Sequence, residues 1–175
     1  MSIYNLDKIF KPNSVAIIGA SESEGSIGHS LIKNILEGGF GGQVFPVNPQ
    51  YESINGLGAY PSVLEINQPI DVAVIATPIA KAPSIIKDCV QARIGGAIII
   101  SAGGKEIGSG GKELEAEIKK EADRGGVRII GPNCMGIVSA ESKLNASFAT
   151  LMPLPGKLAF ISQSGAFARP FLTSP

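Results

Sequence analysis

The fold is decided by one run near the start of the chain, Ser14-Val15-Ala16-Ile17-Ile18-Gly19-Ala20-Ser21. After its opening serine the run is continuously apolar and rich in β-branched residues, which is typical of a strand buried in a parallel sheet. Glycines at positions 19, 25 and 28 lie in the following turn and at the start of a predicted helix over residues 26–37. Strand, glycine-rich turn and helix together predict the first unit of an α/β fold.

The same alternation of strand and helix continues along the chain. Further strands are predicted at residues 43–47, 71–76, 96–100 and 127–130, and further helices at 78–92 and 109–123. We expect Thr77 to be the N-cap of the helix over 78–92 and Pro78 to be its first residue. Strands that alternate with helices predict right-handed crossovers, and therefore a Rossmann-like parallel sheet with helices on both faces.

The alternating pattern weakens after Ile130, where prolines and glycines become frequent. We expect residues 1–135 to form the sheet domain and residues 136–156 to be a linker of loop structure. Residues 157–161 are predicted to form one more strand. Its partner strands are not supplied by this sequence, so residues 157–175 are expected to be the truncated start of a second α/β domain.

Composition excludes several functional classes. Lys plus Arg and Asp plus Glu number 15 each, so the basic surplus of a general nucleic-acid binder is missing. Two cysteines predict neither a disulfide framework nor a zinc site, and no metal site is expected. No signal peptide and no apolar run of membrane-spanning length is visible, so we expect a cytoplasmic protein that does not enter a membrane.

Any ligand is expected beyond the carboxyl ends of the strands, near the switch in strand order. The segments at those ends are small, polar or turn-forming, and no acid, base or nucleophile stands out among them. We therefore expect binding rather than catalysis in this domain, with His29 and Cys89 as packing residues. The segments are 19–21, 47–49, 76–78, 101–103 and 131–134.

Two features of these segments constrain the ligand. The N-terminus of the helix at 26–37 is suited to a phosphate, because backbone N–H groups point out of a helix start. The second predicted strand ends in Val47-Asn48-Pro49, where an NAD-binding domain normally carries Asp or Glu to hold the ribose. The ligand is therefore expected to carry phosphates but not to be NAD.

These segments, in this order, resemble the CoA-binding domain of ADP-forming acetyl-CoA synthetases and of the related succinyl-CoA synthetase α subunit. Further similar stretches are Gly131-Pro132-Asn133-Cys134-Met135-Gly136 and Ser162-Gln163-Ser164-Gly165. The resemblance covers nearly the whole chain. It implies coenzyme A as the cofactor and a flavodoxin-like second domain.

The resemblance also implies a role for each segment. The diphosphate of CoA would lie along the first turn, the adenosine beside the second strand, and the pantetheine arm would run from the third strand toward the fifth. The residues implied, in that order, are Gly19, Ala20, Ser21, Gly25, Ser26 and Ile27; Val47, Asn48 and Pro49; Ala76, Thr77 and Pro78; Ser101, Ala102 and Gly103; and Asn133 and Cys134 near the thiol. Ser162, Ser164 and Gly165 would help to hold phosphate.

The implied activity belongs to a larger enzyme. Such an acid–CoA ligase interconverts acyl-CoA, ADP and phosphate with acid, CoA and ATP, and it needs a phosphorylated histidine in the second domain and an ATP-grasp partner. The histidine in this sequence is His29, which does not match that position. We therefore expect no catalytic residue and no ligase activity in this chain alone, and an oligomeric parent enzyme.

Three alternatives remain open at this point. The chain could be a stand-alone CoA-binding regulatory module, although the strand predicted at 157–161 argues against it. It could instead be the N-terminal region of a synthetase-like protein acetyltransferase, which only downstream sequence would separate from a synthetase. An NAD(P)-dependent enzyme is disfavoured by the missing acid after the second strand.

Overall fold

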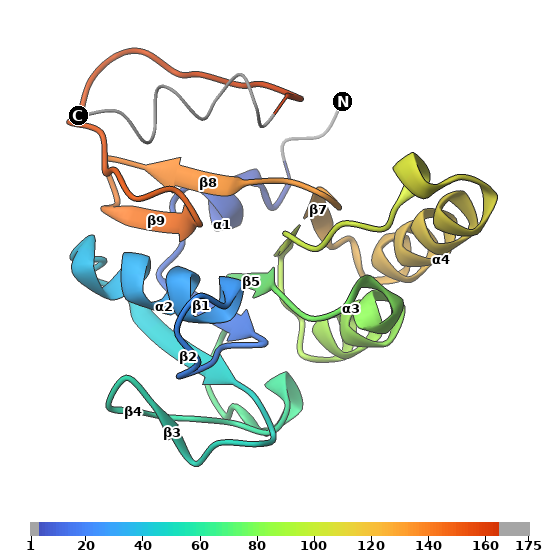
Figure 1. Cartoon of the computed structure of the whole chain (residues 1–175), viewed down its shortest axis with the longest axis horizontal. Helices are drawn as coiled ribbons and strands as arrows, with labels where there is room; N and C mark the ends of the chain where they lie inside the picture. Colours follow the sequence, from blue (N-terminus) through green and yellow to red (C-terminus); the bar gives the residue numbers. More distant parts are fainter. Residues whose placement is uncertain (1–3, 165–175) are drawn as a thin grey trace.

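The computed structural model describes residues 4–164 and is built around a five-stranded sheet (Figure 1). All neighbouring strands pair in parallel, in the order β2-β1-β5-β6-β7. The parallel sheet predicted from the alternating pattern is therefore confirmed. The five strands are β1 (Ser14–Ile18), β2 (Gln43–Val47), β5 (Val72–Ile75), β6 (Gly96–Ile99) and β7 (Arg128–Ile130).

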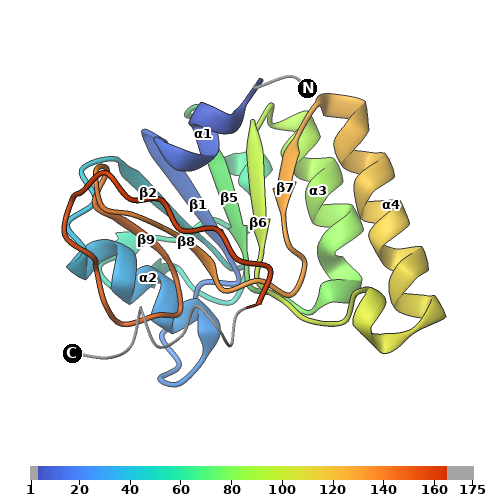
Figure 2. The same cartoon turned by 90° about the horizontal axis from the view of Figure 1, so that it is seen from above.

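Helices cover both faces of this sheet, as predicted. The helices α3 (Ala82–Gln91) and α4 (Ser109–Gly125) lie on one face, and α2 (Ile27–Glu37) lies on the other (Figure 2). Because successive strand residues point to opposite faces, β1 contributes Ala16 and Ile18 to the α3–α4 side and Val15 and Ile17 to the α2 side. Burial on both faces explains why the strands are continuously apolar.

The start of α3 differs from the prediction. Pro78 precedes a short 3₁₀ turn, η2 (Ile79–Lys81), and α3 begins only at Ala82, with Pro83 in its first turn. Thr77 is therefore not an N-cap, and its Oγ1 atom makes no hydrogen bond within the described residues. The prediction failed because the chain carries two prolines five residues apart, and the second of them lies in the first turn of α3.

Residues 136–147 are not the loop that the sequence predicts, whereas residues 148–156 contain no helix or strand, as predicted. β8 (Gly136–Ser139) and β9 (Leu144–Ser147) form an antiparallel hairpin that packs on α2. Leu144 and Ala146 are fully buried in the same core as α2. The side chain of Asn34 in α2 also donates to the carbonyl oxygens of Ser147 (2.8 Å) and Ala149 (2.9 Å). The hairpin is therefore part of the sheet domain.

The prediction of a strand at residues 157–161 is wrong, because the structure contains no helix or strand there. Leu158 and Ile161 are almost completely exposed. A lone extended segment gains no ladder of hydrogen bonds, so strand character depends on a neighbouring strand. The division between a first and a second domain stays a prediction.

Short elements complete the fold. α1 (Leu6–Phe10) lies at the amino ends of the strands, where its Lys8 pairs with Asp71 just before β5. The small hairpin of β3 (Ser53–Ile54) and β4 (Leu57–Gly58) follows β2, and two further 3₁₀ turns are η1 (Val63–Glu65) and η3 (Lys105–Ile107). Within residues 4–164, none of the helices combines the length and the apolar character needed to cross a membrane.

Candidate functional site

The switch in strand order lies between β1 and β5. From β1 the chain moves outward to β2, and it then returns to the other side of β1 to add β5, β6 and β7 in turn. Because all five strands are parallel, their carboxyl ends meet at one edge of the sheet. Open α/β sheets bind ligands at this position.

All five predicted binding segments meet at this carboxyl edge. A series of hydrogen bonds across the sheet links these loops to one another or to the end of the neighbouring strand, which holds the loops in place relative to one another. The bonds are Gly19 N–H to Val47 O (2.9 Å), Ala76 N–H to Ile18 O (2.8 Å), Ser101 Oγ–H to Thr77 O, and Asn133 N–H to Ser101 O (2.9 Å).

Two glycines bring the backbone unusually close together at the switch point. A Cβ atom on Gly28, in the first turn of α2, would lie 1.9 Å from the carbonyl oxygen of Gly19. Gly19 itself has a φ of +90°, and a Cβ there would meet Thr77 at 3.0 Å. Side chains at these positions would push α2 away from the sheet, so the glycines hold the start of α2 against the end of β1.

Ser26 caps the start of α2. Its Oγ accepts the N–H of His29 (3.1 Å) and donates to the carbonyl oxygen of Ser23 (2.8 Å). This satisfies one of the N–H groups that a helix start leaves without an intrahelical partner. The remaining N–H groups of the first turn, at Ile27 and Gly28, face the direction from which an anion would approach a helix start.

Asn48 uses its polar atoms within the protein. Its Nδ2 donates to the carbonyl oxygen of Ala20 (2.8 Å), and its Oδ1 accepts the N–H of Gln50 (3.0 Å). The side chain therefore holds the loop after β2 against the turn after β1. The contact of Asn48 with the adenosine of CoA, which the family resemblance implies, stays a prediction, and in the structure its hydrogen bonds shape the loops.

Carboxylates accept two backbone N–H groups of the loop between β6 and α4. Glu106 accepts the N–H of Gly103 (2.7 Å), and this hydrogen bond holds the pKa of Glu106 below its ordinary value of 4.5. Glu115 similarly accepts the N–H of Lys105 (2.7 Å). Two carboxylates already occupy backbone donors here, so this loop suits an uncharged part of a ligand.

Two further side chains at the edge, those of Thr77 and Cys134, differ in their hydrogen bonding. Thr77 Oγ1 is buried and has no hydrogen-bond partner within the described residues. A buried hydroxyl without a partner costs free energy, which a ligand atom at this edge would recover. Cys134 is satisfied, since its Sγ donates to the carbonyl oxygen of Ile99 (3.2 Å). Burial raises the pKa of this thiol above its ordinary value of 9.0, which makes it a poor nucleophile.

The predicted phosphate-holding residues Ser162 and Ser164 lie in an exposed segment near the end of the described residues. Ser162 and Ser164 bond to each other in an exposed segment, through Ser162 Oγ–H to Ser164 O (3.1 Å) and Ser164 N–H to Ser162 Oγ (3.0 Å). Gly165 lies outside the described residues. Cys89 is a core residue, as predicted, and burial raises the pKa of its thiol to about 12.

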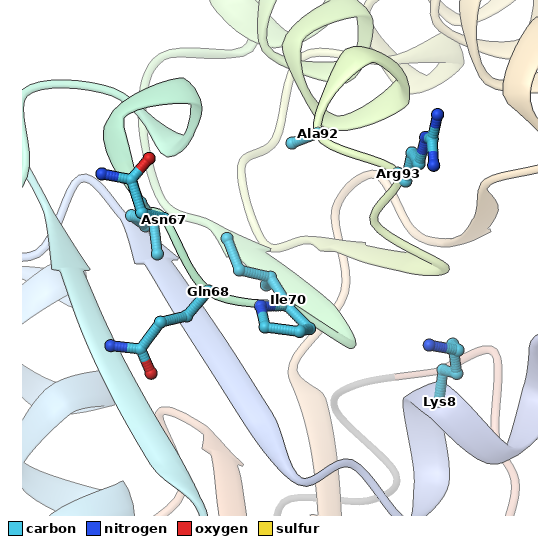
Figure 3. Close-up of a pocket in the computed structure, with 8 residues that line it drawn as sticks. Lys8, Asn67, Gln68, Ile70, Ala92 and Arg93 are labelled. Carbon is cyan, nitrogen blue, oxygen red and sulfur yellow. The ribbon is translucent and has the colours of Figure 1, made fainter.

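A hollow of about 380 Å³ lies elsewhere, beside the amino ends of the strands (Figure 3). It is lined by Lys8 of α1, by residues 66–70 before β5, and by Ala92 and Arg93 after α3. None of the predicted binding residues lines it. Among residues 4–164, no three side chains of His, Cys, Asp or Glu come together in a group that could hold a metal ion.

Comparisons with known proteins identify the family to which the chain is similar. The family described as the CoA binding domain matches residues 13–140. An ADP-forming acetate–CoA ligase of Methanocaldococcus jannaschii is 45% identical over 163 residues, which are 93% of this chain but 23% of that protein. The α subunit of ADP-forming acetate–CoA ligase I of Pyrococcus furiosus is 43% identical over 93% of this chain and 36% of that subunit.

A solved structure is also similar. A dinucleotide-forming acetyl-coenzyme A synthetase 1 of Ca. Korarchaeum cryptofilum, in complex with phosphate and ADP, has a TM-score of 0.91 and 40% identity. The match covers 95% of this chain and 36% of that chain. This chain thus spans between about a quarter and a third of the length of these relatives. The family match over residues 13–140, together with the arrangement of the carboxyl edge, shows that the chain belongs to the CoA binding domain family.

Proposed function

We propose that the chain binds CoA across the carboxyl edge of its sheet and serves as the CoA-binding part of an ADP-forming acid–CoA ligase. The observation that carries this proposal is the joining of five binding loops, by hydrogen bonds, into one edge next to the start of α2. Such an edge can hold a long ligand along its whole length. A mononucleotide would use only the part near the switch point.

The backbone donors along the edge support one orientation of CoA. The diphosphate is proposed to lie at the turn after β1, where Gly19 and Gly28 hold the start of α2 against the end of β1 and α2 offers backbone donors. The uncharged pantetheine arm is proposed to run past Thr77 toward the β6 loop, whose donors are already taken by Glu106 and Glu115. The thiol would then lie near Asn133 and Cys134.

The end of β2 supports CoA over NAD. Val47 is followed by Asn48 and Pro49, so no carboxylate is available directly after β2 to hold ribose hydroxyls. The first acidic residue after β2 is Glu52, which follows the turn and is exposed. We therefore propose that an NAD-dependent reaction is not the function.

The ligase reaction itself is proposed from the relatives. Two relatives are named as ADP-forming acetate–CoA ligases, one of them as a separate α subunit. We propose that this chain contributes binding residues and no catalytic residue, and that a partner subunit or domain of ATP-grasp type completes the enzyme. A cytoplasmic location and an oligomeric parent enzyme are part of the same proposal.

Calorimetric titration of the purified chain tests the proposal, with CoA, dephospho-CoA and NADH as ligands. We expect saturable binding of CoA and no heat from NADH, because the edge lacks the ribose-binding acid. Binding of NADH with CoA silent would overturn the proposal. The same sample should show no acetyl-CoA-dependent formation of ATP from ADP and phosphate.

A further inference from the structure

Two hydroxyl groups from different loops meet beside the start of α2. Ser21 Oγ, in the turn after β1, lies 3.3 Å from the phenolic oxygen of Tyr51, in the loop between β2 and β3. Both side chains are half-buried. Tyr51 follows Pro49 by two residues and carries no sequence signal of a ligand contact.

The hydrogen bonds of this pair leave one proton available. Ser21 Oγ already accepts the N–H of Ser23 (3.0 Å). The two hydroxyls carry two protons, and the bond between them uses one. Within residues 4–164 the other O–H has no acceptor. A ligand oxygen beside the pair would supply that acceptor.

We infer that Tyr51 is a further ligand-contacting residue, which binds one phosphate oxygen of the CoA diphosphate together with Ser21. This inference rests on the proposed function. Two hydroxyl oxygens 3.3 Å apart can both reach one acceptor at hydrogen-bond distance. A phosphate oxygen is such an acceptor, and hydrogen bonds to it are strengthened by its charge.

The neighbouring polar residues do not compete for this role. Asn48, which approaches the same turn, uses its amide nitrogen on Ala20 and its amide oxygen on Gln50. Glu22 keeps its negative charge, but its Oε1 accepts the N–H of Asn55 (2.5 Å), which ties the carboxylate to the β3–β4 hairpin. The Ser21–Tyr51 pair is therefore left to face the ligand.

The test is calorimetric titration of the wild-type chain and Tyr51→Phe with CoA, dephospho-CoA and pantetheine. Removing a hydroxyl that donates to a charged phosphate should weaken CoA and dephospho-CoA about 10-fold each. Any pantetheine binding should be unchanged, because pantetheine has no phosphate. Tyr60→Phe is the matched control, since Tyr60 also lies next to β2 but packs its ring against Phe45.

Ser21→Ala and the double variant complete the experiment. Because both hydroxyls serve one oxygen, the double variant should lose less affinity than the product of the two single losses. Equal CoA affinity of Tyr51→Phe and wild type overturns this inference while the proposed function stands. A loss confined to CoA, with dephospho-CoA unaffected, overturns the assignment to the diphosphate. Failure of the wild-type chain to bind CoA overturns the proposed function instead.

Discussion

Gly28 and Gly19 bring α2 and β1 so close together that no side chain fits between them. Both can be recognised in the sequence as part of a glycine-rich turn, but their spacing does not show which one makes the close contact. The structure shows that Gly28 approaches the carbonyl of Gly19, while a Cβ atom on Gly25 would meet nothing within 4 Å. The glycine pattern thus has two separate physical causes, because Gly25 is needed for its φ of +80°.

Two glycine-to-alanine changes in helices should have opposite effects. Gly28→Ala should lower the free energy of unfolding by about 1–3 kcal/mol, because its Cβ would clash with the backbone of Gly19. Gly110→Ala, in α4 with open space around it, should raise stability by up to about 1 kcal/mol. Urea denaturation of both variants measures this. Equal effects would contradict the close approach of Gly28 to Gly19.

The surroundings of Asp71 lower the pKa of its carboxyl group, which leads to a prediction about stability at low pH. Burial alone would raise the pKa of its carboxyl, but hydrogen bonds from Lys8 Nζ (2.8 Å) and Asn13 N–H (2.8 Å) outweigh burial and hold the pKa below 3.8. The carboxylate therefore stabilises the fold above its unfolded-state pKa, and this contribution disappears as the pH falls through the lower folded-state value.

Asp71→Asn should therefore lower the free energy of unfolding by about 1–2 kcal/mol near neutral pH. This is the lower part of the range for charged hydrogen bonds, because Lys8 is partly exposed. The difference from wild type should shrink as the pH falls below about 4. Chemical denaturation across this pH range measures the difference. A difference in stability that stays constant as the pH falls would contradict the lowered pKa of Asp71.

At the scale of elements, the strands and most helices could be predicted because burial on both faces makes each strand continuously apolar. The hairpin of β8 and β9 could not. β8 is only half-buried, and two of the buried residues of β9, Asn145 and Ser147, are polar. Their side chains are satisfied locally, because Asn145 donates to Ala149 O and Ser147 donates to Asn145. A strand whose buried side chains are polar and hydrogen-bond to nearby residues cannot be told from a loop by its sequence pattern.

Leu144→Ala tests whether the hairpin belongs to the domain core. Leu144 is fully buried against α2, so its truncation should lower the free energy of unfolding by about 2–5 kcal/mol. Phe148→Ala is the control just after the same hairpin, and it should change stability little because Phe148 is 43% exposed. Thermal denaturation separates the two. If Leu144→Ala is as stable as wild type, residues 136–147 are a linker after all.

At the scale of the whole molecule, the meeting of the five loops at one edge could be predicted, but the hydrogen bonding of their side chains could be predicted only in part. Parallel strands place all their carboxyl ends at one edge, so the five loops had to meet there. Which polar atoms remain available depends on contacts between loops, and these are not visible in a pattern of residue types. For this reason the sequence does not reveal that the side chains of Asn48 and Ser26 bond to backbone groups of the protein. It also does not indicate that Tyr51 could contact a ligand.

The most direct test of the central claim is to locate bound CoA by NMR, from changes in backbone amide shifts of the isotope-labelled chain. We predict that the amides of residues 19–28 and 101–103 and of Ala76, Thr77 and Ile79 shift with saturable dependence on CoA. Residues 66–70 and Arg93, around the hollow in Figure 3 at the opposite edge, should not shift. Shifts centred on that hollow, with the carboxyl edge unchanged, would contradict the account.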